Sequence, residues 1–115
     1  MVLQRLQRDR LNLNVPAREW PGGRPLGRIS DLSMGGLSLT GLGSPPSPDI
    51  DTIELQLPWA MHGTSRVRLE VEQRWCQVAR GGRWHAGFRI IRCPDNDHLA
   101  LTHLYSGYAA RLGRH

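Results

Sequence analysis

The hexapeptide DLSMGG at residues 31–36 places a carboxylate, a hydroxyl and two glycines at one turn between two alternating runs. Asp31 and Ser33 are two positions apart, so in extended backbone their side chains lie on the same face. Gly36 has no side chain and therefore lets another group approach the backbone closely. A carboxylate and a hydroxyl on one face can hydrogen-bond a polar ligand, which makes this turn the first candidate binding site.

Arginines cluster near the start of the chain, at Arg5, Arg8 and Arg10. The planar guanidinium group forms paired hydrogen bonds with phosphates and stacks on aromatic faces. If this basic segment folds back over the turn, its guanidinium groups meet the carboxylate and the hydroxyl on one exposed patch of sheet. Such a patch suits an anionic, planar ligand that forms hydrogen bonds. Arg28 and Arg89, expected on neighbouring strands, are weaker candidates for additional positive charge.

The composition indicates one basic domain with an anionic partner. The 115 residues are enough for a single core. Arginine supplies all 15 basic residues, since the chain contains no lysine, and the formal net charge is +5. A basic balance favours nucleotides, nucleic acids or acidic protein surfaces as partners, although a GC-rich genome would also supply arginine in place of lysine.

Several kinds of chemistry are absent from the sequence. It contains no P-loop and no nucleophile elbow, and His98 and His103 are five residues apart rather than the four that would place both on one metal. Cys76 and Cys93 form no CxxC pair and are expected to be reduced, semi-buried thiols. We therefore predict no catalytic residues, no metal site and no cofactor, and a protein that is not an enzyme. No apolar run has the length of a membrane span or a signal peptide, which predicts a cytoplasmic protein that does not span a membrane.

Alternation of apolar and polar residues predicts short strands, separated by turns rich in glycine and proline. The predicted strands are residues 11–15, 26–32, 37–39, 53–57, 66–78 and 84–91. Pro16 is expected to limit pairing after the first strand, and Pro58 is expected to stop the fourth. Gly81 and Gly82 predict a tight hairpin turn before the last strand.

Beyond residue 94 the pattern changes to a helical period. Apolar residues at three- and four-residue steps, from Leu101 to Leu112, predict an amphipathic helix that ends at Gly113. Together these elements predict a mainly β fold, a small closed antiparallel β-barrel with a C-terminal helix packed on it. The predicted organisation is a flexible basic arm over residues 1–10, followed by a single domain over residues 11–115.

The turn and the arginines together resemble the PilZ domain family, bacterial receptors for the second messenger cyclic di-GMP. The signature of that family is a basic RxxxR segment followed by [D/N]xSxxG, and Asp31, Ser33 and Gly36 match the second half in full. Residues 84–90 also resemble a late strand of the family, which a helix follows. The resemblance extends from Gln4 to Leu112 and implies a six-stranded β-barrel with a C-terminal helix.

The resemblance implies a non-catalytic receptor that binds cyclic di-GMP and relays the signal to a partner protein through its arginine arm. Arg10 takes the position of the last arginine of the motif, Arg5 fits an extra arginine often found before it, and Arg8 lies between the two. Leu6 occupies the position of the remaining arginine. The implied ligand site consists of the three arginines and the three residues of the turn.

Two other functions are open on the sequence alone. Leu6 favours a degenerate PilZ-like adaptor that does not bind cyclic di-GMP and acts by protein contact, for example in pilus or motility assembly. Asp31 and Ser33 would then only close an Asx or Ser turn. A basic barrel for single-stranded nucleic acid would need several exposed aromatic residues on one sheet face. The seven aromatic residues here lie mostly at core-like positions, so neither DNA nor RNA is expected.

Overall fold

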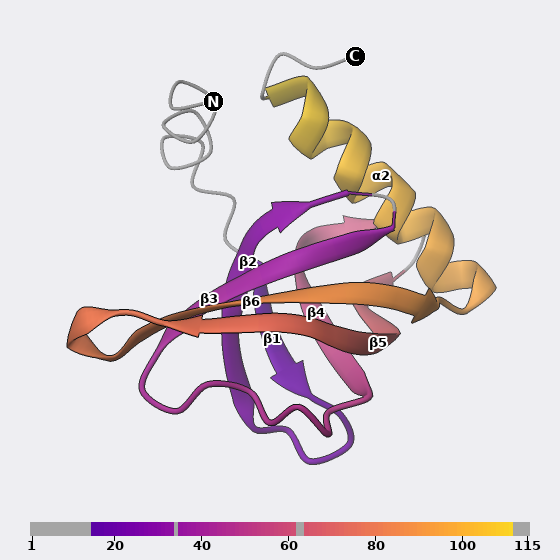
Figure 1. Ribbon diagram of the computed structural model, residues 1–115. Helices are drawn as coiled ribbons and strands as arrows, with labels where there is room; N and C mark the ends of the chain where they lie inside the picture. The colour runs from indigo at the N-terminus through magenta and orange to yellow at the C-terminus, as the bar shows by residue number, and fades with distance from the viewer. Residues whose placement is uncertain (1–14, 34, 62–63, 112–115) are drawn as a thin grey trace.

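The computed structural model describes residues 15–33, 35–61 and 64–111, and these form a closed barrel of six antiparallel strands with one long helix (Figure 1). Around the barrel the strands follow the order β1, β2, β3, β6, β5, β4. The strands are β1 (Pro16–Glu19), β2 (Pro25–Leu32), β3 (Gly36–Leu42), β4 (Thr52–Met61), β5 (Thr64–Val78) and β6 (Arg83–Arg92). A short 3-10 turn, η1 (Arg80–Gly82), joins β5 to β6, and the helix α2 (Asp95–Arg111) follows. The predicted mainly β barrel with a C-terminal helix is confirmed.

The interior of the barrel is filled by the apolar residues of the alternating runs. Alternate side chains of a strand point to opposite faces, so one set from each strand meets in the centre. On β6 the inward set includes Trp84, Ala86 and Phe88, which are at most 3% exposed. Burial of a large apolar side chain contributes about 1.5–3 kcal/mol, so this shared core orders the strands that carry the polar surface residues.

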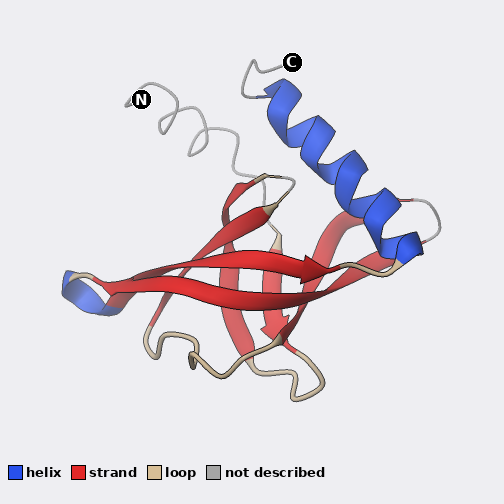
Figure 2. Cartoon of the chain, turned by 45° about the vertical axis from the view of Figure 1, so that its right-hand side comes forward, coloured by secondary structure: helices blue, strands red, loops and turns tan. Residues whose placement is uncertain are grey.

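The helix α2 lies against the barrel beside β5 (Figure 2). Its buried face consists of Ala100, Leu101 and Leu104, at the three- and four-residue steps that the sequence predicts. A second tie comes from Asp97 in the first turn, whose Oδ2 accepts a hydrogen bond from the backbone N–H of Arg68 on β5 at 2.9 Å. Gly113, the predicted end of the helix, lies outside the described residues.

Two expectations about prolines are wrong. Pro16 takes part in the pairing of β1 with β2 instead of limiting it, because the first position of a strand tolerates a residue without an N–H donor; residues 11–14 of the predicted first strand lie outside the described residues. β4 continues through Pro58 to Met61, because its pairing with β1 ends at Leu55 and its pairing with β5 is irregular between Gln56 and Met61. Proline has no backbone N–H to donate, and this loss costs little stability where the hydrogen bonds between the strands are already interrupted.

The β5–β6 hairpin is the longest feature of the sheet and extends beyond the barrel wall (Figures 1 and 2). Gly81 and Gly82 turn the chain with φ of 76° and 78°, which confirms the predicted hairpin. β5 changes register against β6 twice, between Glu70 and Val71 and between Gln73 and Trp75. Such bulges redirect side chains, and the second one helps to form the site described below.

Candidate functional site

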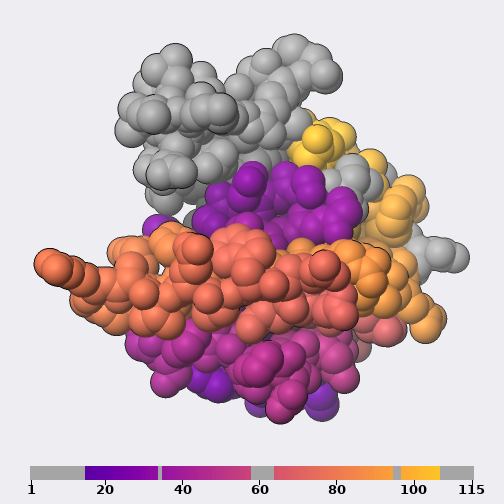
Figure 3. Space-filling model, viewed as in Figure 1, coloured from indigo at the N-terminus to yellow at the C-terminus, as the bar shows by residue number. Residues whose placement is uncertain are grey.

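An open cavity of about 360 Å³ lies on the outer surface of the barrel, across β2, β3, β6 and β5. One part of its wall is the β2–β3 turn with the adjoining strand ends, and the other is the middle of the β5–β6 hairpin. Figure 3 shows these two parts next to each other, with the purple β2–β3 surface directly above the coral and orange surface of β5 and β6. The polar and aromatic lining residues include Asp31, Ser33, Ser38, Arg74, Trp75 and Arg89.

Strand register places four of the lining residues in one row across the sheet. Asp31 on β2 is paired with Ser38 on β3, Ser38 with Gly87 on β6, and Gly87 with Trp75 on β5. Directly paired residues in antiparallel strands point to the same face. Because the flanking residues Ala86 and Phe88 are buried in the core, this row faces outward.

Trp75 lies over β6 at the position where that strand has no side chain. A Cβ atom added to Gly87 would collide with the indole ring of Trp75, including a contact of 2.8 Å to Cζ2. The ring therefore occupies the space that any other residue at position 87 would fill, while 45% of Trp75 stays exposed. This is an aromatic surface fixed by the backbone beneath it and open to a ligand.

Two arginines lie beside the indole in the same cavity. Arg74 is the extra residue at the second bulge of β5, and Arg89 projects from β6. Both guanidinium groups contact Glu72, Arg74 through Nη1 at 3.1 Å and Arg89 through Nε at 3.5 Å. All three side chains are more than half exposed, at 59%, 57% and 53%. The cavity thus combines a planar aromatic surface with a net positive edge.

The β2–β3 turn is held by its own polar groups. The backbone N–H and the hydroxyl of Ser33 both donate to the carbonyl oxygen of Gly36, at 2.9 and 3.2 Å. Asp31 Oδ1 accepts a hydrogen bond from the N–H of Leu32 at 3.0 Å. Because the Ser33 hydroxyl already donates within the turn, its oxygen is left to act as an acceptor toward a ligand.

As predicted, another group lies close to the backbone of Gly36, but that group is part of the protein itself. A Cβ atom at this position would lie 2.7 Å from the carbonyl oxygen of Phe88 on β6. A side chain at position 36 would therefore push β3 away from β6, where residues of both strands line the cavity. The glycine is explained by the strand packing itself.

The structure brings together one half of the predicted site. Asp31, Ser33 and Gly36 line one cavity, as expected, and Arg89 joins them. Arg5, Arg8 and Arg10 lie outside the described residues, with the rest of the predicted basic arm, so their role stays a prediction. Arg28 does not line the cavity, and its predicted adjacency to Arg89 is wrong because β3 lies between β2 and β6.

Sequence reasoning missed Arg74 and Trp75 as site residues. Their position depends on the bulge between Gln73 and Trp75 and on a glycine in the facing strand. A kink in this run is visible in the sequence as a break in alternation after Val71. The pairing of Trp75 with Gly87 is not visible there, because it joins two strands through the register of the hairpin.

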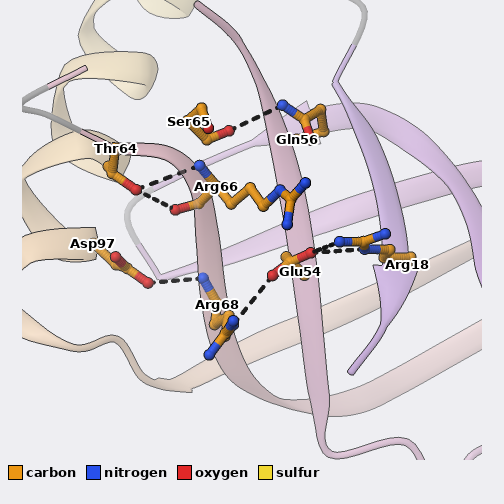
Figure 4. Close-up of polar contacts among 8 residues, drawn as sticks. All are labelled: Arg18, Glu54, Gln56, Thr64, Ser65, Arg66, Arg68 and Asp97. Atoms are coloured by element: carbon orange, nitrogen blue, oxygen red, sulfur yellow. Dashed lines mark hydrogen bonds and ion pairs between the residues drawn. The ribbon is translucent and has the colours of Figure 1, made fainter. Parts of the chain in front are cut away.

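A second polar cluster lies on β1, β4 and β5 (Figure 4). Glu54 is paired with Arg18 on one side and with Arg68 on the other. Its carboxylate accepts hydrogen bonds from Arg18 Nε at 2.7 Å and from Arg68 Nε at 3.1 Å. Arg68 in turn lies 3.6 Å from the ring centre of Trp20, a stacked cation–π contact.

Glu54 is only 2% exposed although it is charged. Burial opposes its ionisation, but the hydrogen bonds from Arg18 and Arg68, together with the positive charges of Arg18 and Arg66, outweigh burial and hold the pKa of the Glu54 carboxyl below its usual range. The cluster is therefore a paired brace between three strands, in which the carboxylate is buried while the Arg18 and Arg68 side chains stay 40% and 50% exposed.

Other chemical features of the described residues are few. No group of three or more His, Cys, Asp or Glu side chains lies close enough there to hold a metal ion. Cys76 is exposed, contrary to prediction, whereas Cys93 is half-buried. Burial and the nearby charge of Asp97 raise the pKa of the Cys93 thiol to about 11. Within the same part of the chain, no helix has the length and apolarity needed to cross a membrane.

Comparisons with known proteins find similarity among solved structures. No family model matches the chain, and no curated protein matches it. Among solved structures, the PlzA protein of Borreliella burgdorferi, crystallised in complex with c-di-GMP, is similar with a TM-score of 0.47 and 14% sequence identity. The match covers 90% of this chain and 48% of PlzA, so the chain spans about half the length of that protein.

Proposed function

We propose that this protein is a non-catalytic receptor that binds cyclic di-GMP in the cavity between the β2–β3 turn and the β5–β6 hairpin. The observation that supports this most directly is the composition of the cavity. The DxSxxG residues of the turn share it with an exposed indole and two arginines that the sequence motif does not include. Its volume of about 360 Å³ is in the range typical of ligand sites.

Each lining residue suits one part of a cyclic dinucleotide. The exposed face of Trp75 stacks on a guanine base, a contact available to any planar base. Arg74 and Arg89 supply paired donors for a phosphate or for O6 and N7 of guanine. Asp31 accepts from the N1–H and N2–H groups of guanine, and the Ser33 oxygen acts as a further acceptor.

The basic arm is long enough to take part. The carbonyl oxygen of Val15 accepts a hydrogen bond from the N–H of Ile29 at 3.0 Å, so the chain enters β1 beside β2, two residues from Asp31. Arg10 precedes Val15 by five residues, which span about 17 Å when extended. We infer that Arg10, with Arg5 and Arg8, closes over the ligand from this side.

Signal relay follows from ordering of the arm. Binding would bring together the arginines of the arm, which repel one another in the free protein. This would change the surface that the protein presents to a partner. We propose that the output lies in a separate effector protein that recognises the changed surface.

Titration calorimetry with cyclic di-GMP tests the proposal. We expect micromolar or tighter binding by the wild type, lost in Asp31→Ala and in Arg10→Ala. Arg66→Ala is the control, because Arg66 is an exposed arginine of β5 that does not line the cavity. An equal loss in Arg66→Ala would attribute binding to bulk charge instead. Arg5→Ala and Arg8→Ala show which arginine substitutes for the one replaced by Leu6.

The alternative is a PilZ-like adaptor that binds no nucleotide and acts by protein contact. Two observations favour it, since Ser33 closes the turn and Gly36 packs against Phe88 without any ligand. Absence of detectable heat at ligand concentrations well above micromolar would select this alternative.

A further inference from the structure

Glu72 connects the two arginines of the cavity without lining the cavity itself. It is the cross-strand partner of Arg89 and precedes Arg74 by two residues on β5. One carboxylate oxygen, Oε1, receives both contacts, at 3.1 Å from Arg74 Nη1 and at 3.5 Å from Arg89 Nε. The two positive side chains of the site therefore share a single negative group placed outside it.

This arrangement lowers the positive charge that an anion meets. Two guanidinium groups and one carboxylate carry a net charge of +1, whereas the guanidinium groups alone carry +2. The contacts are exposed, and exposed ion pairs are weak and easily exchanged. A phosphate that forms paired hydrogen bonds with a guanidinium group makes a stronger contact than a single one at 3.5 Å.

We propose that Glu72 is a built-in competitor of the ligand, which holds Arg74 and Arg89 in the free protein and sets the affinity of the site for a phosphate-bearing ligand. This inference rests on the proposed function. The anion displaces the carboxylate from the arginines on binding, so Glu72 weakens binding and reduces its dependence on salt.

The chain offers a closely matched control at Glu70. Glu70 lies on the same strand, two residues away, and contacts Arg92 at 3.7 Å. Its side chain is 52% exposed, compared with 53% for Glu72, and it does not line the cavity. Glu70→Gln and Glu72→Gln remove the same charge from nearly the same place, but only Glu72→Gln frees the two arginines of the site.

Calorimetric titration of cyclic di-GMP into the full chain, at low and at moderate salt, tests the inference. We expect Glu72→Gln to bind about three- to tenfold more tightly than the wild type at low salt, a range set by two exposed ion pairs. Its affinity should also fall more steeply with salt, because one more positive charge faces the ligand. Glu70→Gln should stay within about twofold of the wild type.

The outcomes separate the inference from the function on which it rests. Equal or weaker binding by Glu72→Gln, beside normal binding by the wild type, overturns the competitor role and leaves the proposed function intact. An equal gain in Glu70→Gln also overturns it, because the effect is then general charge. Absence of binding by the wild type and by both variants overturns the proposed function together with the inference.

Discussion

The barrel carries two clusters of one glutamate between two arginines, and they differ in burial. Glu54 lies between Arg18 and Arg68 and is 2% exposed, whereas Glu72, between Arg74 and Arg89, is 53% exposed. The same combination of one glutamate and two arginines thus forms a brace with a buried carboxylate in one place and an exposed, positively charged rim in the other.

The difference arises from what covers each glutamate. Over Glu54, Arg68 is fixed by its stack on Trp20, and the backbone of the same residue is tied to α2 through Asp97. Glu72 has no such cover from the part of the chain that the structure describes, since the neighbouring Trp75 lies across Gly87 on β6 instead. An enclosed carboxylate is committed to its arginines, because any separation leaves a buried charge unpaired. An exposed carboxylate can release its arginines, which then bind a ligand.

The largest expected effect is on stability. Glu54→Ala should lower the free energy of unfolding by about 2–3 kcal/mol, because two arginines lose the partner that joins β1, β4 and β5. Urea denaturation measures the loss. The matched variant Glu72→Ala should change stability by less than about 0.5 kcal/mol. Similar losses in both variants would remove the distinction between brace and rim.

A second prediction concerns the aromatic surface of the open cluster. Trp75→Ala should weaken binding of cyclic di-GMP about tenfold, the value expected for loss of one base stack. Gly87→Ala should weaken it in the same direction, because the new Cβ atom displaces the indole while keeping it in the chain. Titration calorimetry measures both variants, with Trp20→Ala as the control from the enclosed cluster. Full affinity in Trp75→Ala would refute stacking.

The smallest effect is the acid response of the enclosed cluster. Because the pKa of Glu54 is held below its usual value of 4.5, its contribution to stability is fully present above about pH 4.5. It is lost as pH falls through the lowered pKa. The stability difference between the wild type and Glu54→Gln should therefore narrow in urea titrations between pH 7 and pH 3. If the difference in the free energy of unfolding stayed constant over this pH range, the charge of Glu54 would contribute nothing to stability.

Much of the fold could be predicted from the sequence, because alternation reports burial directly. The strand at residues 84–91 is predicted by local alternation, and the structure buries alternate residues of β6, Trp84, Ala86 and Phe88. The pairing of Pro16 in β1 and the passage of β4 through Pro58 were not foreseen, because they depend on which neighbouring strand needs each N–H group. Local pattern cannot show where a ladder is already interrupted.

The candidate site divides in the same way. Asp31, Ser33 and Gly36 belong to one turn, so their spacing alone placed them together. Trp75 and Gly87 meet only through a bulge and the register of a long hairpin. Glu54 alternates with the apolar residues Ile53 and Leu55, a pattern typical of an outward-facing side chain, and its burial by residues of β1 and β5 cannot be foreseen from β4 alone.

The central claim is that the exposed cluster, and not the enclosed one, meets the nucleotide. Nuclear magnetic resonance of the 15N-labelled chain during titration with cyclic di-GMP tests this most directly. The chain has four tryptophans, and we predict that the indole N–H signal of Trp75 shifts strongly together with the amide of Gly87, while those of Trp20 and Glu54 stay in place. Shifts concentrated at Trp20 and Glu54, or none at saturating ligand, would contradict the account.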